Sequence, residues 1–118
     1  MIPGFEIETA PLDEYEETVL LPMMVRSLRA HVGKAQAVKN AYICKRLTAL
    51  GYKVNDARIR KLISHIRTKG FVPCLIATSA GYYVATDRKE LMDYIDSLKG
   101  RELAIRAVRE AIEEQAGL

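Results

Sequence analysis

Apolar residues recur at helical spacing early in the chain. A helix that begins at Asp13 and ends at Gly33 would place six of them on one face: Val19, Leu20, Met23, Met24, Leu28 and Val32. Asp13 can cap this helix, and the acidic residues that follow suit its N-terminal end. Pro22 lacks a backbone donor, so the pattern predicts either a kink there or a helix that begins near it. Residues 1–12 hold two prolines and a glycine without any periodicity, and we expect a flexible arm.

The middle of the chain predicts two shorter helices joined by a turn. The first is capped by Asn40 and closes at Gly51, and the second covers about 56–69, is capped by Asn55 and stops at Gly70. Their apolar faces hold Ile43, Leu47 and Leu50 in the first, and Ile59, Leu62, Ile63 and Ile66 in the second. Two helices linked by a short turn with a glycine are the helix-turn-helix pattern.

A β-hairpin is expected directly after these helices. Residues 74–78 and 82–86 are rich in β-branched and aromatic side chains, and residues 79–81 between them form a turn that ends in glycine. Tyr82 and Tyr83 point to opposite faces of a strand, so one is expected in the core while the other could stack on a sugar or phosphate. The hairpin completes a helix-turn-helix with a two-stranded wing.

A long helix is expected from Asp87 to about Gln115. Asp87 and Glu90 have the spacing of a capping box, and Gly100 could interrupt the helix near its middle. Its apolar stripe has heptad spacing and needs a partner surface. The helix either folds back onto the first helix of its own chain or pairs with a second copy. We favour a homodimer because residues of opposite sign flank the stripe, and the dimerisation candidates are Leu91, Ile95, Leu98, Ile105, Val108 and Ile112.

These elements predict a mainly helical α+β protein in three parts. The arm is expected at residues 1–12, and a winged helix-turn-helix domain that includes the N-terminal helix is expected at residues 13–86. The long C-terminal helix at residues 87–118 is the expected dimerisation element.

Charge separates the middle of the chain from its ends. The formal net charge of the 118 residues is +3, yet between Lys34 and Gly70 ten lysines and arginines stand against one acidic residue, Asp56. Such a segment is either a solvated lysine-rich surface or a site for a polyanion. The helix-turn-helix order favours the second interpretation and makes double-stranded DNA the expected partner.

Other classes of function find little support in the sequence. It lacks a glycine-rich phosphate loop, an HExxH pair, a metal-ligand cluster and a nucleophile beside either histidine. We therefore expect that the protein is not an enzyme and that it has neither a cofactor nor a metal site. No small-molecule ligand is evident from the sequence. No apolar run approaches the roughly 20 residues that span a membrane. Cys44 and Cys74, without an export signal, suggest reduced thiols in a cytoplasmic protein.

The stretch from Ile59 to Ala85, IRKLISHIRTKGFVPCLIATSAGYYVA, resembles the winged helix-turn-helix superfamily. It is similar in particular to biotin-repressor-type and related domains, whose recognition helix ends in glycine and is followed by a short strand, a turn and a glycine-aromatic strand. The wider run from Asn40 onward is similar to small winged-helix proteins of phages and prophages. Ala80 departs from the pattern at the wing tip, where a lysine or arginine would reach phosphate. The sequence therefore does not decide whether the wing contacts DNA.

The resemblance implies DNA binding in the cytoplasm, that of a bacterial host if the chain is phage-derived. Transcription regulation and an accessory role in replication or packaging are both compatible with it. Winged helices also serve as docking modules. The alternative is therefore a protein–protein interaction module that uses this scaffold, with the C-terminal helix for assembly.

The helix at 56–69 is expected to enter the major groove with the face opposite its apolar residues. Arginine and lysine on that face could donate to guanine, and small or hydroxyl-bearing side chains let the helix approach the bases. The base-reading candidates are Ala57, Arg60, Lys61, Ser64 and Thr68. The phosphate-contact candidates, which would fix register without reading sequence, are Lys45, Arg46, Lys53, Asn55, Arg58, His65, Arg67 and Lys69.

Two of the phosphate candidates have a structural alternative. Arg58 could instead pair with Asp56 or another neighbouring carboxylate. His65, at the edge of the outward face, is more often a surface histidine than a DNA contact in this kind of position.

Overall fold

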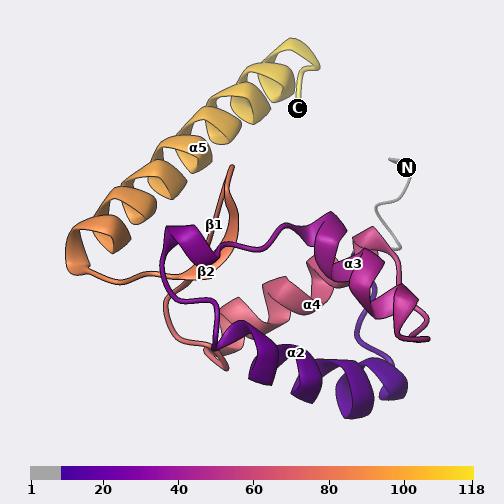
Figure 1. Ribbon diagram of the computed structural model, residues 1–118. Helices are drawn as coiled ribbons and strands as arrows, with labels where there is room; N and C mark the ends of the chain where they lie inside the picture. The colour runs from indigo at the N-terminus through magenta and orange to yellow at the C-terminus, as the bar shows by residue number, and fades with distance from the viewer. Residues whose placement is uncertain (1–8) are drawn as a thin grey trace. The chain divides into compact units, whose positions relative to one another are not determined.

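The computed structural model describes residues 9–118 of the chain (Figure 1). The described part is mainly helical, with a two-stranded antiparallel sheet, which agrees with the expected α+β class. It divides into two compact units at the boundary between Thr86 and Asp87. The elements are η1 (Glu16–Leu20), α2 (Leu21–Leu28), η2 (Lys34–Gln36), α3 (Asn40–Ala49), α4 (Asp56–Lys69), β1 (Leu75–Thr78), β2 (Gly81–Val84) and α5 (Arg88–Gln115).

The first helix starts with a reciprocal cap. The backbone N–H of Glu16 donates to the Asp13 carboxylate at 2.8 Å, and the N–H of Asp13 donates to the Glu16 carboxylate at 3.0 Å. This arrangement is a capping box with aspartate in the place of serine or threonine. The predicted cap at Asp13 is confirmed.

The body of this helix differs from the prediction. Helical residues from Glu14 run without a break through η1, which is a π-helical turn, into α2. In that turn the N–H of Leu21 donates to the carbonyl of Glu16, five residues back. Pro22, which has no N–H, follows at once, so it lies where the hydrogen-bond ladder changes from five-residue to four-residue spacing. The helix ends at Leu28, before the predicted end at Gly33.

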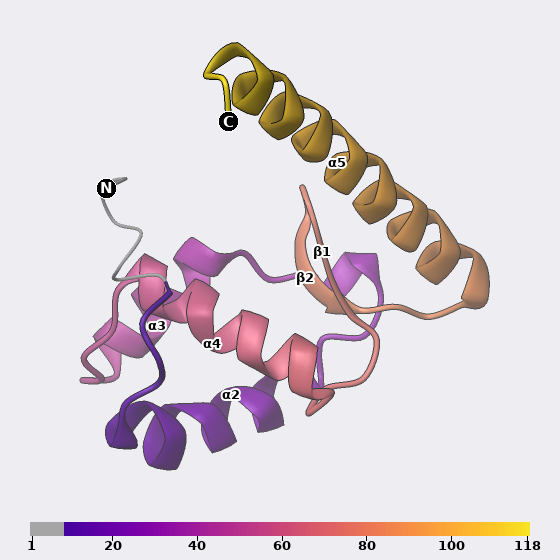
Figure 2. The same ribbon diagram turned by 180° about the vertical axis from the view of Figure 1, so that it is seen from behind.

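The core of the first unit lies where α2, α3 and α4 meet (Figure 1 and Figure 2). The apolar face of α4 supplies Ile59, Leu62, Ile63 and Ile66, each at most 2% exposed. These side chains share one cluster with Leu20, Met24, Leu28 and Leu47 from the other helices. Burial on this scale is the main favourable term for the fold, at about 25 cal/mol per Å² of apolar surface.

Both ends of α4 agree with the prediction. The Asn55 side chain accepts a hydrogen bond from the N–H of Arg58 at 2.9 Å, as an N-cap does. Gly70 follows the last residue in the left-handed conformation, with φ of 71°. The two ends of α4 are thereby set by local signals.

Asn40 does not cap α3, and that prediction is wrong. It is the first residue of the helix, and Lys39 occupies the N-cap position without a side-chain hydrogen bond. The Asn40 amide nitrogen instead donates to the carbonyl of Asp56 at 3.0 Å, and its oxygen accepts from the Tyr82 hydroxyl at 3.0 Å. One side chain thus connects the beginnings of α3 and α4 with β2.

The hairpin is shorter than predicted. Its register pairs Leu75 with Val84 and Thr78 with Gly81, so Ser79 and Ala80 alone form the turn. Gly81 belongs to β2, with φ of 121°. A Cβ atom at this position would lie 2.6 Å from the carbonyl oxygen of Val38. Glycine is therefore required by the close approach of another backbone segment.

That segment, residues 31–38, runs along the free edge of β2. Val38 and Tyr82 exchange two backbone hydrogen bonds of 3.0 and 2.8 Å, and the N–H of Val84 donates to the carbonyl of His31 at 2.7 Å. Val32, which was predicted on the first helix, lies in this segment before η2 and beside Val84. The connection between α2 and α3 thus covers the edge of β2 through two isolated bridges, at Val32 and Val38, with η2 between them.

In the second unit, α5 begins and ends as predicted. The Asp87 carboxylate accepts from the N–H of Glu90 at 2.8 Å, and the helix continues to Gln115 through Gly100 without interruption. None of its residues is buried, and Ile105 is 70% exposed. Within residues 9–118, no helix combines the length and the apolar character needed to cross a membrane.

The arm expected at residues 1–12 lies mostly outside the described residues. At its described end, the carbonyls of Ala10 and Pro11 accept hydrogen bonds from the Arg58 guanidinium at 2.9 and 3.0 Å. These two residues are therefore tethered to the N-terminal turn of α4, contrary to the expectation of a flexible arm.

Candidate nucleic-acid interface

The five base-reading candidates lie together on the face of α4 opposite its core residues. Arg60, Ser64 and Thr68 are exposed, whereas Ala57 and Lys61 are half-buried. Because Ile59, Leu62, Ile63 and Ile66 fill the core, this face is the part of the helix that remains for a partner. Small side chains at positions 57 and 64, about one turn before and one turn after the two cations, leave room for a partner to approach the helix.

The two hydroxyl groups on this face differ in whether they can donate a hydrogen bond to a partner. The Thr68 hydroxyl donates to the carbonyl of Ser64 at 2.9 Å, one turn back. Its hydrogen is thereby used inside the helix, and the oxygen can only accept a further hydrogen bond. The Ser64 hydroxyl has no partner in the part of the chain that the structure describes. Ser64 can therefore donate or accept.

Arg58 does not point outward, and its assignment as a phosphate contact is not supported. Its Nε donates to Glu16 Oε2 at 2.8 Å and its Nη2 donates to Glu16 Oε1 at 2.7 Å. The side chains of Arg58 and Glu16 are 14% and 5% exposed. The partner is neither Asp56 nor any other carboxylate near in sequence, because the first helix brings Glu16 to the start of α4.

The pair changes the protonation of both partners. Hydrogen bonds from Arg58 lower the pKa of Glu16 below its ordinary value, although burial of the carboxyl works in the opposite direction. The same hydrogen bonds raise the pKa of Arg58, against the effect of its burial. Both groups are charged at neutral pH, and each neutralises the other.

The remaining phosphate candidates are spread over several elements. Lys45, Lys53, Asn55 and Lys69 are exposed, while Arg67 is half-buried. His65 packs edge-on against Phe71, with ring centroids 5.7 Å apart, which favours its interpretation as a surface histidine. The Asn55 oxygen serves as the cap of α4, and a phosphate contact at this helix N-terminus stays a prediction.

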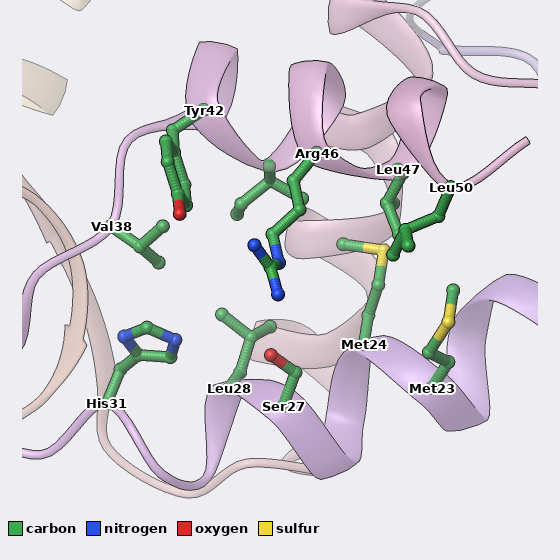
Figure 3. A pocket seen from close by; sticks show the side chains of 11 residues that line it. Met23, Met24, Ser27, Leu28, His31, Val38, Tyr42, Arg46, Leu47 and Leu50 are labelled. Atoms are coloured by element: carbon green, nitrogen blue, oxygen red, sulfur yellow. The ribbon is translucent and has the colours of Figure 1, made fainter. Parts of the chain in front are cut away.

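Arg46 has a different environment from the one expected. It lines a cavity between α2 and α3, together with Met24 and Leu28 of α2 (Figure 3). The cavity lies on the side of α3 that faces α2, and no residue of α4 lines it. Arg46 is nevertheless exposed, so its phosphate contact stays a prediction.

Lys39 is a cation that the sequence analysis did not assign. It lies beside the turn of the hairpin, where it lines an open hollow with Ala80, Ala35 and Gln36. Ala80 leaves the turn itself without a basic side chain. The pairing of Val38 with Tyr82 brings Lys39 to this place, and the only signal in the sequence was its membership of the basic segment.

The described residues offer no obvious metal site. Among residues 9–118 there is no group of three or more His, Cys, Asp and Glu side chains placed to hold an ion. Cys44 and Cys74 carry free thiols. Burial, reinforced by the Asp56 carboxylate, raises the pKa of the Cys44 thiol and keeps it protonated.

No family model, curated protein or solved structure matches this chain.

Proposed function

We propose that this protein binds double-stranded DNA, without catalysis, through a winged helix-turn-helix unit whose α4 enters the major groove. The observation that carries the proposal is the outward face of α4. Arg60, Lys61 and Ser64 project from a helix whose opposite face is the most deeply buried surface of the unit. Arginine and lysine can donate to guanine O6 and N7, and the Ser64 hydroxyl can serve a base or a phosphate.

The order of elements supports a winged-helix arrangement. A helix, the segment 31–38 with the short helix η2 inside it, two further helices and a hairpin follow one another, and Val32 and Val38 of that segment bridge to β2. In helix-turn-helix proteins the second helix of the motif lies in the groove with its N-terminal residues nearest the bases. By this analogy, α3 would cross the backbone and α4 would read the bases.

The distribution of charge supports a polyanionic partner. Arg58 is neutralised by Glu16 and Arg46 turns toward α2, but several exposed cations remain around α4: Lys39, Lys45, Lys53 and Lys69. We assign phosphate contacts to these residues, with Lys39 beside the hairpin where Ala80 has no charge. Such contacts would hold the protein in register on the duplex.

The exposed side of α5 favours self-association as a second element of the function. Ile95, Leu98, Ile105, Val108 and Ile112 are between 41% and 70% exposed. An apolar stripe of this length is seldom left in water. We infer that α5 pairs with α5 of a second copy. A dimer whose two α4 helices lay on one side about 34 Å apart would reach successive major grooves. The alternative partner of this stripe is another protein in a larger assembly.

A salt titration tests the proposal. Fluorescence anisotropy with a labelled random-sequence duplex should give an affinity that falls with salt at a log–log slope near −4 to −5, as for about five neutralised phosphates. Replacing Arg60 and Lys61 together by Ala should abolish preference among sequences in a binding selection. Lys45→Ala should weaken all sequences alike.

The matched control removes two positive charges elsewhere in the same unit. Arg26→Ala with Lys34→Ala should preserve the sequence preference. If the duplex is bound but the Arg60 and Lys61 changes leave both affinity and preference unchanged, α4 is not the element that reads the bases. If the duplex is not bound even at low salt, DNA binding is the wrong function. The protein-interaction alternative would then remain.

A further inference from the structure

The cavity between α2 and α3 has the dimensions of a small-ligand site. Its volume is 270 Å³, close to the lower end of the roughly 300–1,000 Å³ common for ligand pockets. Apolar side chains of α2, α3 and the segment between them form most of its wall: Met23, Met24, Leu28, Val38, Ile43 and Leu47. Two of these are methionines, whose flexible side chains adapt to the shape of a ligand.

A cation extends into this apolar space. In Figure 3 the Arg46 side chain reaches from α3 toward Leu28 and Ser27 on α2, with Tyr42 and His31 at one end of the cavity. Within the described residues the side chains of Arg46, Ser27 and Tyr42 have no hydrogen-bond or ion-pair partner. Among residues 9–118, no acidic residue lines the cavity. The guanidinium thus faces the cavity without a counterion from this part of the chain.

His31 is oriented by the chain itself. Its Nδ1 lies 2.7 Å from the carbonyl oxygen of Gln36, so Nδ1 carries the hydrogen and donates it. Nε2 is left for another partner. The polar groups available to a ligand are therefore one guanidinium, two hydroxyls and one imidazole nitrogen, around an apolar floor.

We propose that this cavity binds a small carboxylic acid with a compact apolar body. The apolar body would lie against Met24, Leu28 and Leu47, and the flat carboxylate would accept two parallel hydrogen bonds from the Arg46 guanidinium. A phosphate dianion fits less well, because a single cation with apolar walls replaces too little of its hydration. The proposal stands apart from DNA binding, since no residue of α4 lines the cavity.

The test uses the full chain with its methionine methyl groups labelled with ¹³C. Titration with sodium phenylacetate should give saturable shifts of the Met23 and Met24 methyl signals and leave Met92, on α5, unmoved. Phenylacetamide, which has the same shape without the charge, should bind at least about tenfold more weakly. Inorganic phosphate should leave all the signals in place.

Two neighbouring cations provide a matched pair of variants. Arg46→Gln should weaken phenylacetate binding about tenfold and leave the amide unaffected. Lys45→Gln removes the same charge from the neighbouring residue, which is also exposed but does not line the cavity, and should change neither. Arg46→Lys keeps the charge without the planar fork and should bind with intermediate affinity.

Three results would overturn the proposal. The Met23 and Met24 signals could remain unmoved up to about 10 mM phenylacetate, a level that detects even millimolar affinity. The amide could bind as tightly as the acid, or the two Gln variants could lose affinity equally, which would indicate nonspecific attraction of an anion.

Discussion

Glu16 and Arg58 join two helices through a two-point ion pair between residues 42 positions apart. The carboxylate belongs to the capping box of the first helix, and the guanidinium also binds the carbonyls of Ala10 and Pro11. Both side chains are largely buried, so water screens their attraction little. One ion pair therefore fixes the end of the arm, the start of the first helix and the first turn of α4.

Removing one partner should be costly. Glu16→Ala leaves the buried Arg58 guanidinium without its counterion and should lower the free energy of unfolding by about 3–5 kcal/mol. Urea denaturation followed by circular dichroism measures the change. Glu17→Ala, at the exposed neighbouring position, should stay within about 0.5 kcal/mol. Equal losses in the two variants would show that the pair contributes nothing specific.

The same pair predicts a dependence of stability on pH. Because the pKa of Glu16 is lowered in the folded protein, the unfolded chain takes up the proton first as the pH falls. The stabilisation is complete above the ordinary glutamate value of about 4.3 and is lost as the pH falls further, through the folded pKa. Urea midpoints of the natural chain and of Glu16→Gln should therefore converge in acid. A gap that stays constant down to about pH 2.5 would contradict the lowered pKa.

Two glycines should respond in opposite ways to the same substitution. At Gly81, with φ of 121°, an alanine Cβ would meet the Val38 carbonyl oxygen at 2.6 Å, and we expect a loss of about 2 kcal/mol or more. At Gly100 nothing lies within 4 Å, and alanine should stabilise α5 by about 1 kcal/mol. Thermal unfolding of both variants measures the effects. A tolerated Gly81→Ala would mean that residues 31–38 do not lie against β2.

Self-association through α5 should depend on one side of the helix. Leu98→Asp with Ile105→Asp places two charges in the heptad stripe and should yield monomers by light scattering. Leu103→Asp, at a comparably exposed residue off the stripe, should leave the mass unchanged. A dimer that survives the double change would exclude pairing through this stripe, and a chain that is monomeric before any change would exclude pairing altogether.

The parts of the fold that local signals define could be predicted from the sequence. The bounds of α4 follow from Asn55 as its cap and Gly70 in the left-handed conformation after it. The start of α5 follows in the same way from Asp87. In both helices the decisive contacts join residues at most three positions apart, and the outward face of α4 then follows from its 3.6-residue period.

Contacts between distant residues could not be predicted in this way. Asparagine is a common N-cap residue, but the Asn40 side chain forms hydrogen bonds with the Asp56 carbonyl and the Tyr82 hydroxyl instead. These two groups come near Asn40 only after folding. The helical spacing of α4 places Arg58 at the edge of the outward face, but its side chain turns inward because it forms an ion pair with Glu16. The cavity beside Arg46 depends on how α2 packs against α3, and hydrophobic periodicity does not record packing distances.

The amide of Asn40 also limits how the hairpin can move. Its oxygen accepts from Tyr82 in β2 while its nitrogen donates to the carbonyl of Asp56, the residue that opens α4. Both hydrogen bonds are 3.0 Å long, so either bond would break if its donor and acceptor moved much further apart. A duplex that pushed the hairpin aside would have to break one of these bonds or carry the first turn of α4 along with it.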